Sequence, residues 1–191
     1  MAKVIVFEHL STDGYFMDED GDISWTKNNH DPQFNEFTSD NIKQGGILVF
    51  GRITYELMAR YWPTPEAFES FPDVALSMNN LPKIVFSKTL REATWSNTHI
   101  IHRDLLGQMQ KLKEESKSDI VILGSGSVVA QVTSSDVIDE YQFIYNPIIL
   151  GSGRTLFDGV HENTYLKLLE SKAFQNGKVF VRYKAMRSPR K

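Results

Sequence analysis

Glycine and hydroxyl residues follow a short apolar run at 120–129, where the sequence reads IVILGSGSVV. Glycine lets a backbone approach a ligand closely, and the free N–H groups at the start of a helix attract anions such as phosphate. The segment is not a Rossmann fingerprint, because Val129 stands in place of the third glycine, and no Gly-Lys-Ser/Thr of a P-loop follows. Taken alone, it indicates either a phosphate cradle or a tight structural turn.

Two further segments place phosphate-compatible groups just after an apolar run. In 49–56 (VFGRITYE), Arg52 and the hydroxyl of Thr54 lie at an expected helix start. The segment 84–89 (IVFSKT) ends in Ser87, Lys88 and Thr89. Ligands of open α/β sheets bind outside the carboxyl ends of the parallel strands. Arg52 could instead form a surface ion pair and Ser87 could cap a strand end. The three segments together favour a ligand with several phosphates, a nucleotide.

The first apolar run is interrupted at its carboxyl end by Glu8 and His9. A polar residue in a buried strand is more often satisfied by its neighbours than reactive, and Asp13-Gly14 is typical of a turn. The five histidines do not combine with acids in a metal-binding pattern, so no metal site is expected. The absence of cysteine excludes disulfides, thiolate zinc sites and a cysteine nucleophile.

Short β-rich runs alternate with segments of helical period, which predicts an α/β fold. Two runs, 46–50 and 120–123, lack polar alternation and should form central parallel strands. The last three follow one another without a helix and should be antiparallel, so the sheet should be mixed. The expected strands are 3–9, 46–50, 82–86, 98–102, 119–123, 139–149, 164–172 and 177–186.

A helix should begin at Asp31-Pro32, an N-cap followed by proline, and run to about Gln44, where Gly45-Gly46 ends it. The remaining expected helices are 54–61, 66–79, 105–115 and a short one after Gly126. The longest segment expected to lack regular structure is 11–30, which contains the acidic run DEDGD. Loops of this length are usually functional or mobile.

The composition predicts one globular domain spanning 1–191. Lys and Arg number 21 against 24 Asp and Glu, and this net charge of −3 argues against a nucleic-acid binder. No apolar run approaches the roughly 20 residues that cross a membrane. We therefore expect a cytoplasmic protein without a membrane anchor.

Several motifs occur together in an order that resembles the dihydrofolate-reductase-like superfamily. More closely, the chain resembles stand-alone proteins related to the carboxyl-terminal reductase domain of riboflavin biosynthesis, the RibD C-terminal domain family. The resemblance covers nearly the whole chain, and its most specific parts are GRITYE and PIILGSGRTLF. The motifs are STDG at 11–14, DGDISW at 20–25, GRITYE at 51–56, FSK at 86–88, LGSG at 123–126 and NPIILGSGRTLF at 146–157.

The resemblance implies a three-layer α/β/α fold around a mixed, mostly parallel eight-stranded sheet that binds NADPH. It places phosphates at a helix start after 51, the adenosine ribose and its 2′-phosphate at 87–88, the pyrophosphate at 124–128 and the nicotinamide at the end of the first strand. It also implies a homodimer. The cofactor-binding residues implied are His9, Gly51, Arg52, Thr54, Ser87, Lys88, Gly124, Ser125, Gly126, Ser127 and Val128.

The catalytic residues are less directly indicated. Dihydrofolate reductases place an acid on their first helix, where this chain has Asn35 with Glu36 beside it, and riboflavin-pathway reductases commonly have one where Leu123 stands. The acidic loop at 18–22 would also oppose a phosphorylated substrate. The candidates for the substrate pocket are Asp13, Trp25 and Glu36, with Tyr55 and Trp62 as further aromatics.

Three functions are consistent with these features. The leading hypothesis is an NADPH-dependent reductase of a small planar heterocycle, similar to a pteridine or pyrimidine. The second is the riboflavin-pathway step itself, reduction of a phosphoribosylamino-pyrimidinone. The third is a catalytically inactive NADP(H)-binding module that acts as a sensor or partner protein, which Asn35 keeps open.

Overall fold

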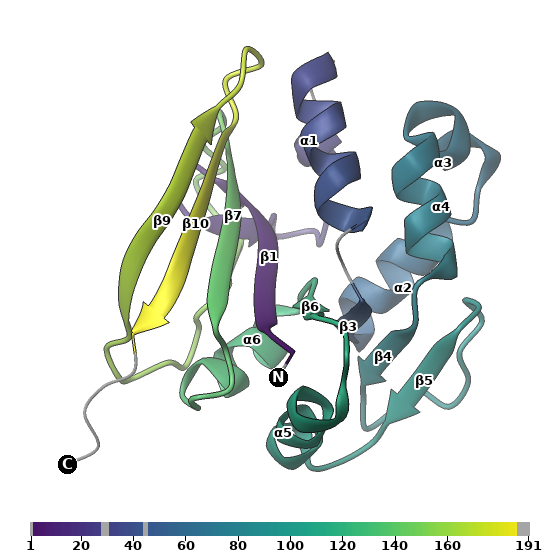
Figure 1. The fold of residues 1–191 in the computed structure, drawn as a ribbon. Helices are drawn as coiled ribbons and strands as arrows, with labels where there is room; N and C mark the ends of the chain where they lie inside the picture. Colours follow the sequence, from purple (N-terminus) through teal and green to yellow (C-terminus); the bar gives the residue numbers. More distant parts are fainter. Residues whose placement is uncertain (1, 28–30, 44–45, 187–191) are drawn as a thin grey trace.

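Eight strands form one continuous sheet in the order β5-β4-β3-β6-β1-β7-β10-β9 (Figure 1). The computed structural model describes residues 2–27, 31–43 and 46–186. Six neighbouring strands from β5 to β7 are parallel, and β10 runs antiparallel to both β7 and β9, which confirms the mixed sheet. The strands are β1 Val4–Ser11, β3 Ile47–Gly51, β4 Lys83–Phe86, β5 Thr98–Ile101, β6 Ile120–Ile122, β7 Glu140–Asn146, β9 Tyr165–Ala173 and β10 Val179–Met186.

The central strands are buried on both faces, as their unbroken apolar runs predicted. Leu48, Val49 and Phe50 of β3 are inaccessible to solvent, and so are Ile120 and Ile122 of β6. Residues that alternate along a strand point to opposite faces, so these side chains contribute to two separate cores. The sheet is therefore covered by helices on both sides where its parallel strands lie.

Two groups of helices make the outer layers and confirm the three-layer α/β/α architecture. On one face, α1, α2 and α4 pack against the sheet, and α3 packs on α4. On the other face, α5 and α6 contribute apolar side chains to the core that contains Val4 and Val6 of β1. The helices are α1 Pro32–Lys43, α2 Arg52–Tyr61, α3 Pro65–Ser70, α4 Pro72–Asn80, α5 Leu105–Glu115 and α6 Gly126–Thr133.

The single helix predicted over 66–79 is wrong, because two helices occupy this stretch. Phe71 separates them with φ −143° and ψ 66°, a conformation outside the helical region. The residue before a proline is disfavoured in helical geometry, and Pro72 then serves as the first residue of α4. The helix predicted over 54–61 begins two residues earlier, at Arg52.

The segment 11–30 contains more regular structure than the sequence indicated. Strand β2, Tyr15–Met17, pairs with β8, Arg154–Thr155, in a separate two-stranded sheet, and a short 3-10 helix, η1, covers Ser24–Lys27. The end of this segment at 28–30 lies outside the described residues, as does the predicted end of the first helix at Gln44-Gly45. In the described part of the chain, no helix is both long and apolar enough to cross a membrane.

Candidate functional site

The turn after β3 and the glycine-rich turn after β6 meet at the carboxyl edge of the sheet. The N–H of Gly51 donates to the carbonyl oxygen of Gly124 at 3.0 Å. A Cβ placed on Gly51 would overlap the hydroxyl of Ser125 and lie 3.1 Å from its Cβ. A Cβ on Gly126 would lie 2.9 Å from Phe16 Cε1 and 3.0 Å from the carbonyl oxygen of Thr155, so a side chain at either glycine would crowd its neighbours.

Two helices begin side by side at this contact. Gly51 is the N-cap of α2 and Ser125 the N-cap of α6, and neither helix start has a side-chain cap hydrogen bond. The hydroxyls of Ser125 and Ser127 lie 3.1 Å apart, with Ser127 exposed at the first turn of α6. Adjacent helix starts present N–H groups and partial positive charge, which suits an anionic group such as a pyrophosphate.

Arg52 and Thr54 occupy different environments, although both lie in the first turn of α2. Arg52 is exposed, and its guanidinium pairs with Glu56 at 3.1 Å, one helical turn later. Thr54 is 5% exposed and lines a cavity on the sheet. The structure therefore leaves Arg52 exposed at the carboxyl edge of the sheet and turns Thr54 toward the interior.

The ends of β4 and β5 add polar and cationic groups to the same edge. The hydroxyl of Ser87 accepts hydrogen bonds from the N–H groups of Thr89 and Leu90, at 3.2 and 2.9 Å, and so stabilises the turn. Lys88 is exposed beside it. His102 follows β5 and brings its Nδ1 to 2.8 Å from the carbonyl oxygen of Ser87. Sequence reasoning missed His102, which the parallel pairing of β4 and β5 brings to this point.

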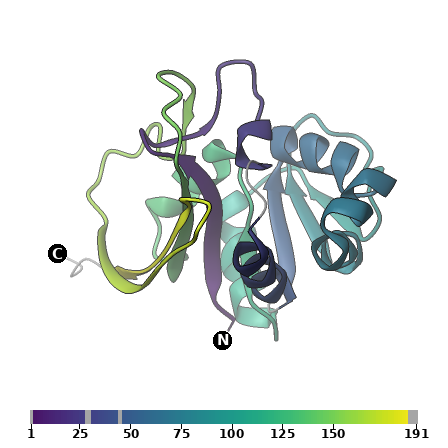
Figure 2. The same cartoon turned by 90° about the horizontal axis from the view of Figure 1, so that it is seen from above.

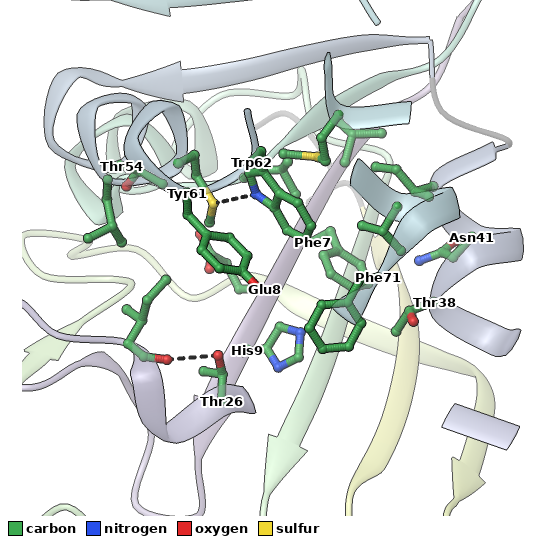
Figure 3. Close-up of a pocket in the computed structure, with 18 of the residues that line it drawn as sticks. Phe7, Glu8, His9, Thr26, Thr38, Asn41, Thr54, Tyr61, Trp62 and Phe71 are labelled. Carbon is green, nitrogen blue, oxygen red and sulfur yellow. Dashed lines mark hydrogen bonds between the residues drawn. The ribbon is translucent and has the colours of Figure 1, made fainter. Parts of the chain in front are cut away.

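A cavity of about 570 Å³ lies between the sheet and the helices α1, α2 and α4. Figure 3 shows β1 crossing it, with Glu8 and His9 on the strand and Thr54 and Tyr61 on α2. From η1, Thr26 reaches its other side. Much of its wall is aromatic, formed by Phe7, Phe34, Tyr61, Trp62 and Phe71. A flat apolar ring matches such a wall, because aromatic side chains prefer offset-stacked or edge-on contacts.

Buried oxygens without a partner lie where the cavity approaches the glycine-rich turn. Glu8 Oε1 and Thr54 Oγ1 are inaccessible to solvent, and neither has a hydrogen-bond partner among the described residues. A Cβ on Gly124 would lie 2.7 Å from the first oxygen and 3.0 Å from the second, so both oxygens face the same small space. Burial raises the pKa of Glu8 to about 8. The sequence showed Glu8 as an interruption of an apolar run but did not indicate that its Oε1 would lack a hydrogen-bond partner among the described residues.

His9 is held neutral in the same cavity. Burial, reinforced by the charge of Lys178, lowers the pKa of His9 to about 3. The ring packs edge-on against Phe7 and Phe34, with ring centroids 5.9 and 6.3 Å away. Its Nδ1 is buried without a hydrogen-bond partner among the described residues. His9 can therefore offer a neutral donor or acceptor to a ligand, but no positive charge near pH 7.

The three predicted catalytic candidates do not line this cavity. Asp13 is exposed and accepts hydrogen bonds from the Ser11 hydroxyl at 2.6 Å and the N–H of Gly151 at 2.7 Å, which ties two loops together. The hydrogen bond from Ser11 is the main cause that lowers the pKa of Asp13. Trp25 is buried in η1 and donates its indole N–H to the carbonyl oxygen of Asp22.

Helical periodicity explains why Glu36 is absent from the cavity. Phe34, Thr38 and Asn41 of α1 line it, at spacings of four and three residues. Glu36 lies two residues from Phe34, a rotation of about 200° around the helix, and is exposed. Of the two aromatics considered with the candidates, Trp62 lines the cavity, and Tyr55 is buried in the core.

The fold is that of known reductases. A dihydrofolate reductase of Enterococcus faecalis complexed with NADP(H) superposes with a TM-score of 0.61 at 17% identity, covering 96% of each chain. A candidate riboflavin biosynthesis protein from Shewanella sp. PV-4 superposes with a TM-score of 0.74 at 23% identity, covering 98% of this chain and 100% of the other. At these identities the likeness establishes the fold.

Sequence relatives and a family model assign the chain more closely. The uncharacterized protein YyaP of Bacillus subtilis (strain 168) is 25% identical over 181 residues, which cover 95% of this chain and 94% of YyaP. The model of the RibD C-terminal domain matches residues 2–180. That match includes the glycine-rich turns, β1 and all the residues that line the cavity except Arg182, so this chain belongs to the RibD C-terminal domain family.

Proposed function

We propose that the protein is an NADPH-dependent reductase that transfers a hydride to a small planar heterocycle, similar to a pteridine or pyrimidine. The observation that carries the proposal is the position of the aromatic cavity, which meets the glycine-rich turn at Gly124. An elongated cofactor bound along the turns would thus bring one end to the cavity. Membership of the RibD C-terminal domain family supports a reductase.

The chain's own residues fit a dinucleotide phosphate along the carboxyl edge of the sheet. In the order of the strands, Lys88 follows β4, Gly51 ends β3, Ser125 follows β6 and His9 lies near the end of β1. Neighbouring strands lie about 4.8 Å apart, so these positions span roughly 15 Å, the scale of an extended dinucleotide. The crowded glycines at the two helix starts support a pyrophosphate there, because they keep side chains away from the free N–H groups.

Each part of this edge has a role in the proposed reaction. Bound NADPH would supply the hydride. Lys88 would bind the 2′-phosphate, and the N–H groups at the starts of α2 and α6 would bind the pyrophosphate. The aromatic wall would orient the ring of the substrate and exclude water from it. His9 would remain neutral beside the transferred hydride, because its pKa is about 3.

A second candidate, an NADP(H)-binding module without catalysis, has one observation in its favour. The helix α1 directs Phe34, Thr38 and Asn41 into the cavity, and none of these three side chains is an acid. Turnover separates the two candidates. We expect the purified protein to oxidise NADPH when one of a panel of pteridines and pyrimidinones is added, the phosphoribosylated pyrimidinone of the riboflavin pathway among them. Tight NADPH binding without turnover of any compound would favour the module.

We also propose that the protein forms a homodimer through β9. All nine residues of β9 are exposed, and within the described part of the chain the strand pairs on one side only, with β10. Figure 2 shows β9 and β10 curving away from the helices. Tyr165, Leu168 and Leu169 are 71%, 52% and 43% exposed on this edge, and long apolar edge strands are usually covered by another chain.

Light scattering tests the dimer. A second copy suits the edge because β9 carries both Lys167 and Glu170, so that an antiparallel copy can place opposite charges across the interface; within the chain, Glu170 also pairs with Arg182 of β10 at 3.0 Å. We expect twice the chain mass of 21.9 kDa for the wild type and the single mass for Leu168→Lys. The matched control Glu115→Lys, on α5, should remain dimeric. A monomeric wild type would overturn this proposal.

A further inference from the structure

We infer that Glu8 and Thr54 form a binding site for one neutral amide group of a ligand, contacting both its N–H and its C=O. The inference rests on the proposed function and specifies which ligand group is recognised between the cavity and the glycine-rich turn. Neither residue belongs to the candidates that the sequence provided for catalysis.

The geometry of the two oxygens carries the argument. Glu8 comes from β1 and Thr54 from α2, yet Glu8 Oε1 and Thr54 Oγ1 converge beside Gly124, where any side chain would contact them at 2.7 and 3.0 Å. Both atoms are shielded from solvent and lack a partner among the described residues. Leaving such polar groups unsatisfied costs about 1–3 kcal/mol each, so a role in folding alone does not explain them.

Among the described residues, the surroundings of Glu8 offer its Oε1 no hydrogen-bond partner. Across the sheet its register partner is Phe143 of β7, an apolar residue. Besides Glu8 and His9, the charged and titratable groups that line the cavity are Lys3, Asp22, Lys27, Arg60, Tyr61, Glu66, Asp119, Glu140 and Arg182. Burial is the cause of the raised pKa of Glu8, and no neighbouring charge contributes.

The protonation state of Glu8 selects the ligand chemistry. With a pKa of about 8, the carboxyl group is neutral at pH 7 and presents one O–H donor and one carbonyl acceptor. An amide presents the complementary N–H and C=O on adjacent atoms, so acid and amide can form two parallel hydrogen bonds. The hydroxyl of Thr54 can supply a third. An ionised or purely apolar ligand group would leave at least one of these atoms unpaired.

Two ligands could supply the amide, namely the carboxamide of the nicotinamide ring and the lactam edge of a heterocyclic substrate. Binding experiments on the full chain distinguish them. The probes are NADPH, whose dihydronicotinamide ring is uncharged, 2′,5′-ADP, which has the phosphates but no nicotinamide, and pterin, which has a lactam. Affinities are measured by calorimetry between pH 6.5 and 9.5 for the wild type, Glu8→Leu and Glu8→Gln.

We expect Glu8→Leu to lower the binding affinity of the amide-bearing probe on the order of tenfold, the equivalent of one to two lost neutral hydrogen bonds. Glu8→Gln keeps a donor and an acceptor, so its affinity at pH 7 should stay near that of the wild type. Wild-type affinity should fall as the pH rises through the pKa of Glu8, by up to about the tenfold expected for Glu8→Leu, and the Glu8→Gln profile should be flat. If Glu8→Leu loses affinity for NADPH but not for 2′,5′-ADP, the amide that Glu8 contacts is the carboxamide of the nicotinamide ring. Loss for pterin alone would assign it to the substrate.

Other outcomes overturn the inference. Unchanged affinity of Glu8→Leu for both NADPH and pterin would exclude contact with Glu8. A pH dependence that survives in Glu8→Gln would belong to another group, such as Lys178, whose pKa burial lowers to about 8. If the wild type binds 2′,5′-ADP while Glu8 proves irrelevant, the cofactor site stands and this inference fails. If the wild type binds neither nucleotide, the proposed function itself fails.

Discussion

Replacing Gly51 with alanine should destabilise the protein, because the new methyl group would overlap the hydroxyl of Ser125. The backbone at Gly51, with φ −84° and ψ 164°, is open to alanine, so the effect would come from the contact alone. The hydroxyl can rotate away, but Ser125 Cβ and N would still lie 3.1 and 3.3 Å from the methyl carbon. These distances require the two turns to separate slightly.

The expected loss follows from two opposing terms. Overpacking of a tight contact costs about 1–3 kcal/mol, and replacing glycine with alanine gains about 0.4–1 kcal/mol through the unfolded chain. We therefore expect Gly51→Ala to lower the free energy of unfolding by about 1–2 kcal/mol, or Tm by about 2–4 °C per kcal/mol for a chain of this size. Urea unfolding measures the free energy. NADPH binding should weaken as well, since the same turns present the N–H groups.

A double-mutant cycle isolates the contact. Ser125→Gly removes both the hydroxyl and the Cβ, so Gly51→Ala should be tolerated in that background, with about 1 kcal/mol of the loss recovered. Ser127→Gly is the matched control, because Ser127 is exposed two residues away and should recover nothing. If Ser125→Gly and Ser127→Gly recover the same free energy of unfolding, the two turns are not in contact, and the proposed phosphate site between them is wrong.

Three further predictions concern single side chains. The pKa of Glu8 is raised by burial from 4.5 to about 8, so stability present below pH 4.5 is lost as the pH rises toward 8. Glu8→Gln should therefore have a free energy of unfolding up to about 3 kcal/mol higher than that of the wild type at pH 7, but no higher at pH 4.5. Urea unfolding at both pH values measures this difference. The same difference at both pH values would contradict the burial of the Glu8 carboxyl group. Asp31→Ala should lower Tm by several degrees, because Asp31 caps α1 at the N–H groups of Gln33 and Phe34; an unchanged melting curve would argue against the cap. Lys88→Ala should lower the affinity for NADPH about tenfold or more and leave the affinity for NADH unchanged, since a charged hydrogen bond contributes about 1.5–3 kcal/mol. An equal loss of affinity for both nucleotides would place the 2′-phosphate elsewhere.

Much of the sheet could be predicted from the sequence, because local signals determined it. Each of the eight predicted strands corresponds to a strand of the sheet, and the unbroken apolar runs of β3 and β6 indicated central positions. The N-cap of α1 followed from Asp31-Pro32, and its side chain accepts the expected N–H groups. The glycine-rich turn after β6 followed from the motif at 123–126.

Features that depend on tertiary contacts could not be predicted in this way. The pairing of β2 with β8 joins segments about 140 positions apart in the sequence. Both strands are too short to show a clear alternation of apolar and polar residues. The break at Phe71 is a local effect of Pro72, but the apolar pattern of 66–79 favoured the prediction of one continuous helix. Asp13 anchors two loops, a role that only its contact with Gly151 reveals.

The substrate side of the site was the hardest part to predict. Whether an acid on α1 enters the cavity depends on helix rotation, and the structure turns Phe34 and Thr38 inward while Glu36 points to solvent. The side chain of Glu8 reaches Gly124 because β1 pairs with β6 only as far as Val6, five residues before its pairing with β7 ends at Ser11. Neither fact is encoded in the spacing of residues along one segment.

The most direct test of the account is a fluorescence titration of the purified protein with NADPH and with NADH, using its three tryptophans as donors. We expect saturable binding of both nucleotides and a clear preference for NADPH, which Lys88→Ala should abolish. Failure of the wild type to bind NADPH would contradict the cofactor site at the starts of α2 and α6.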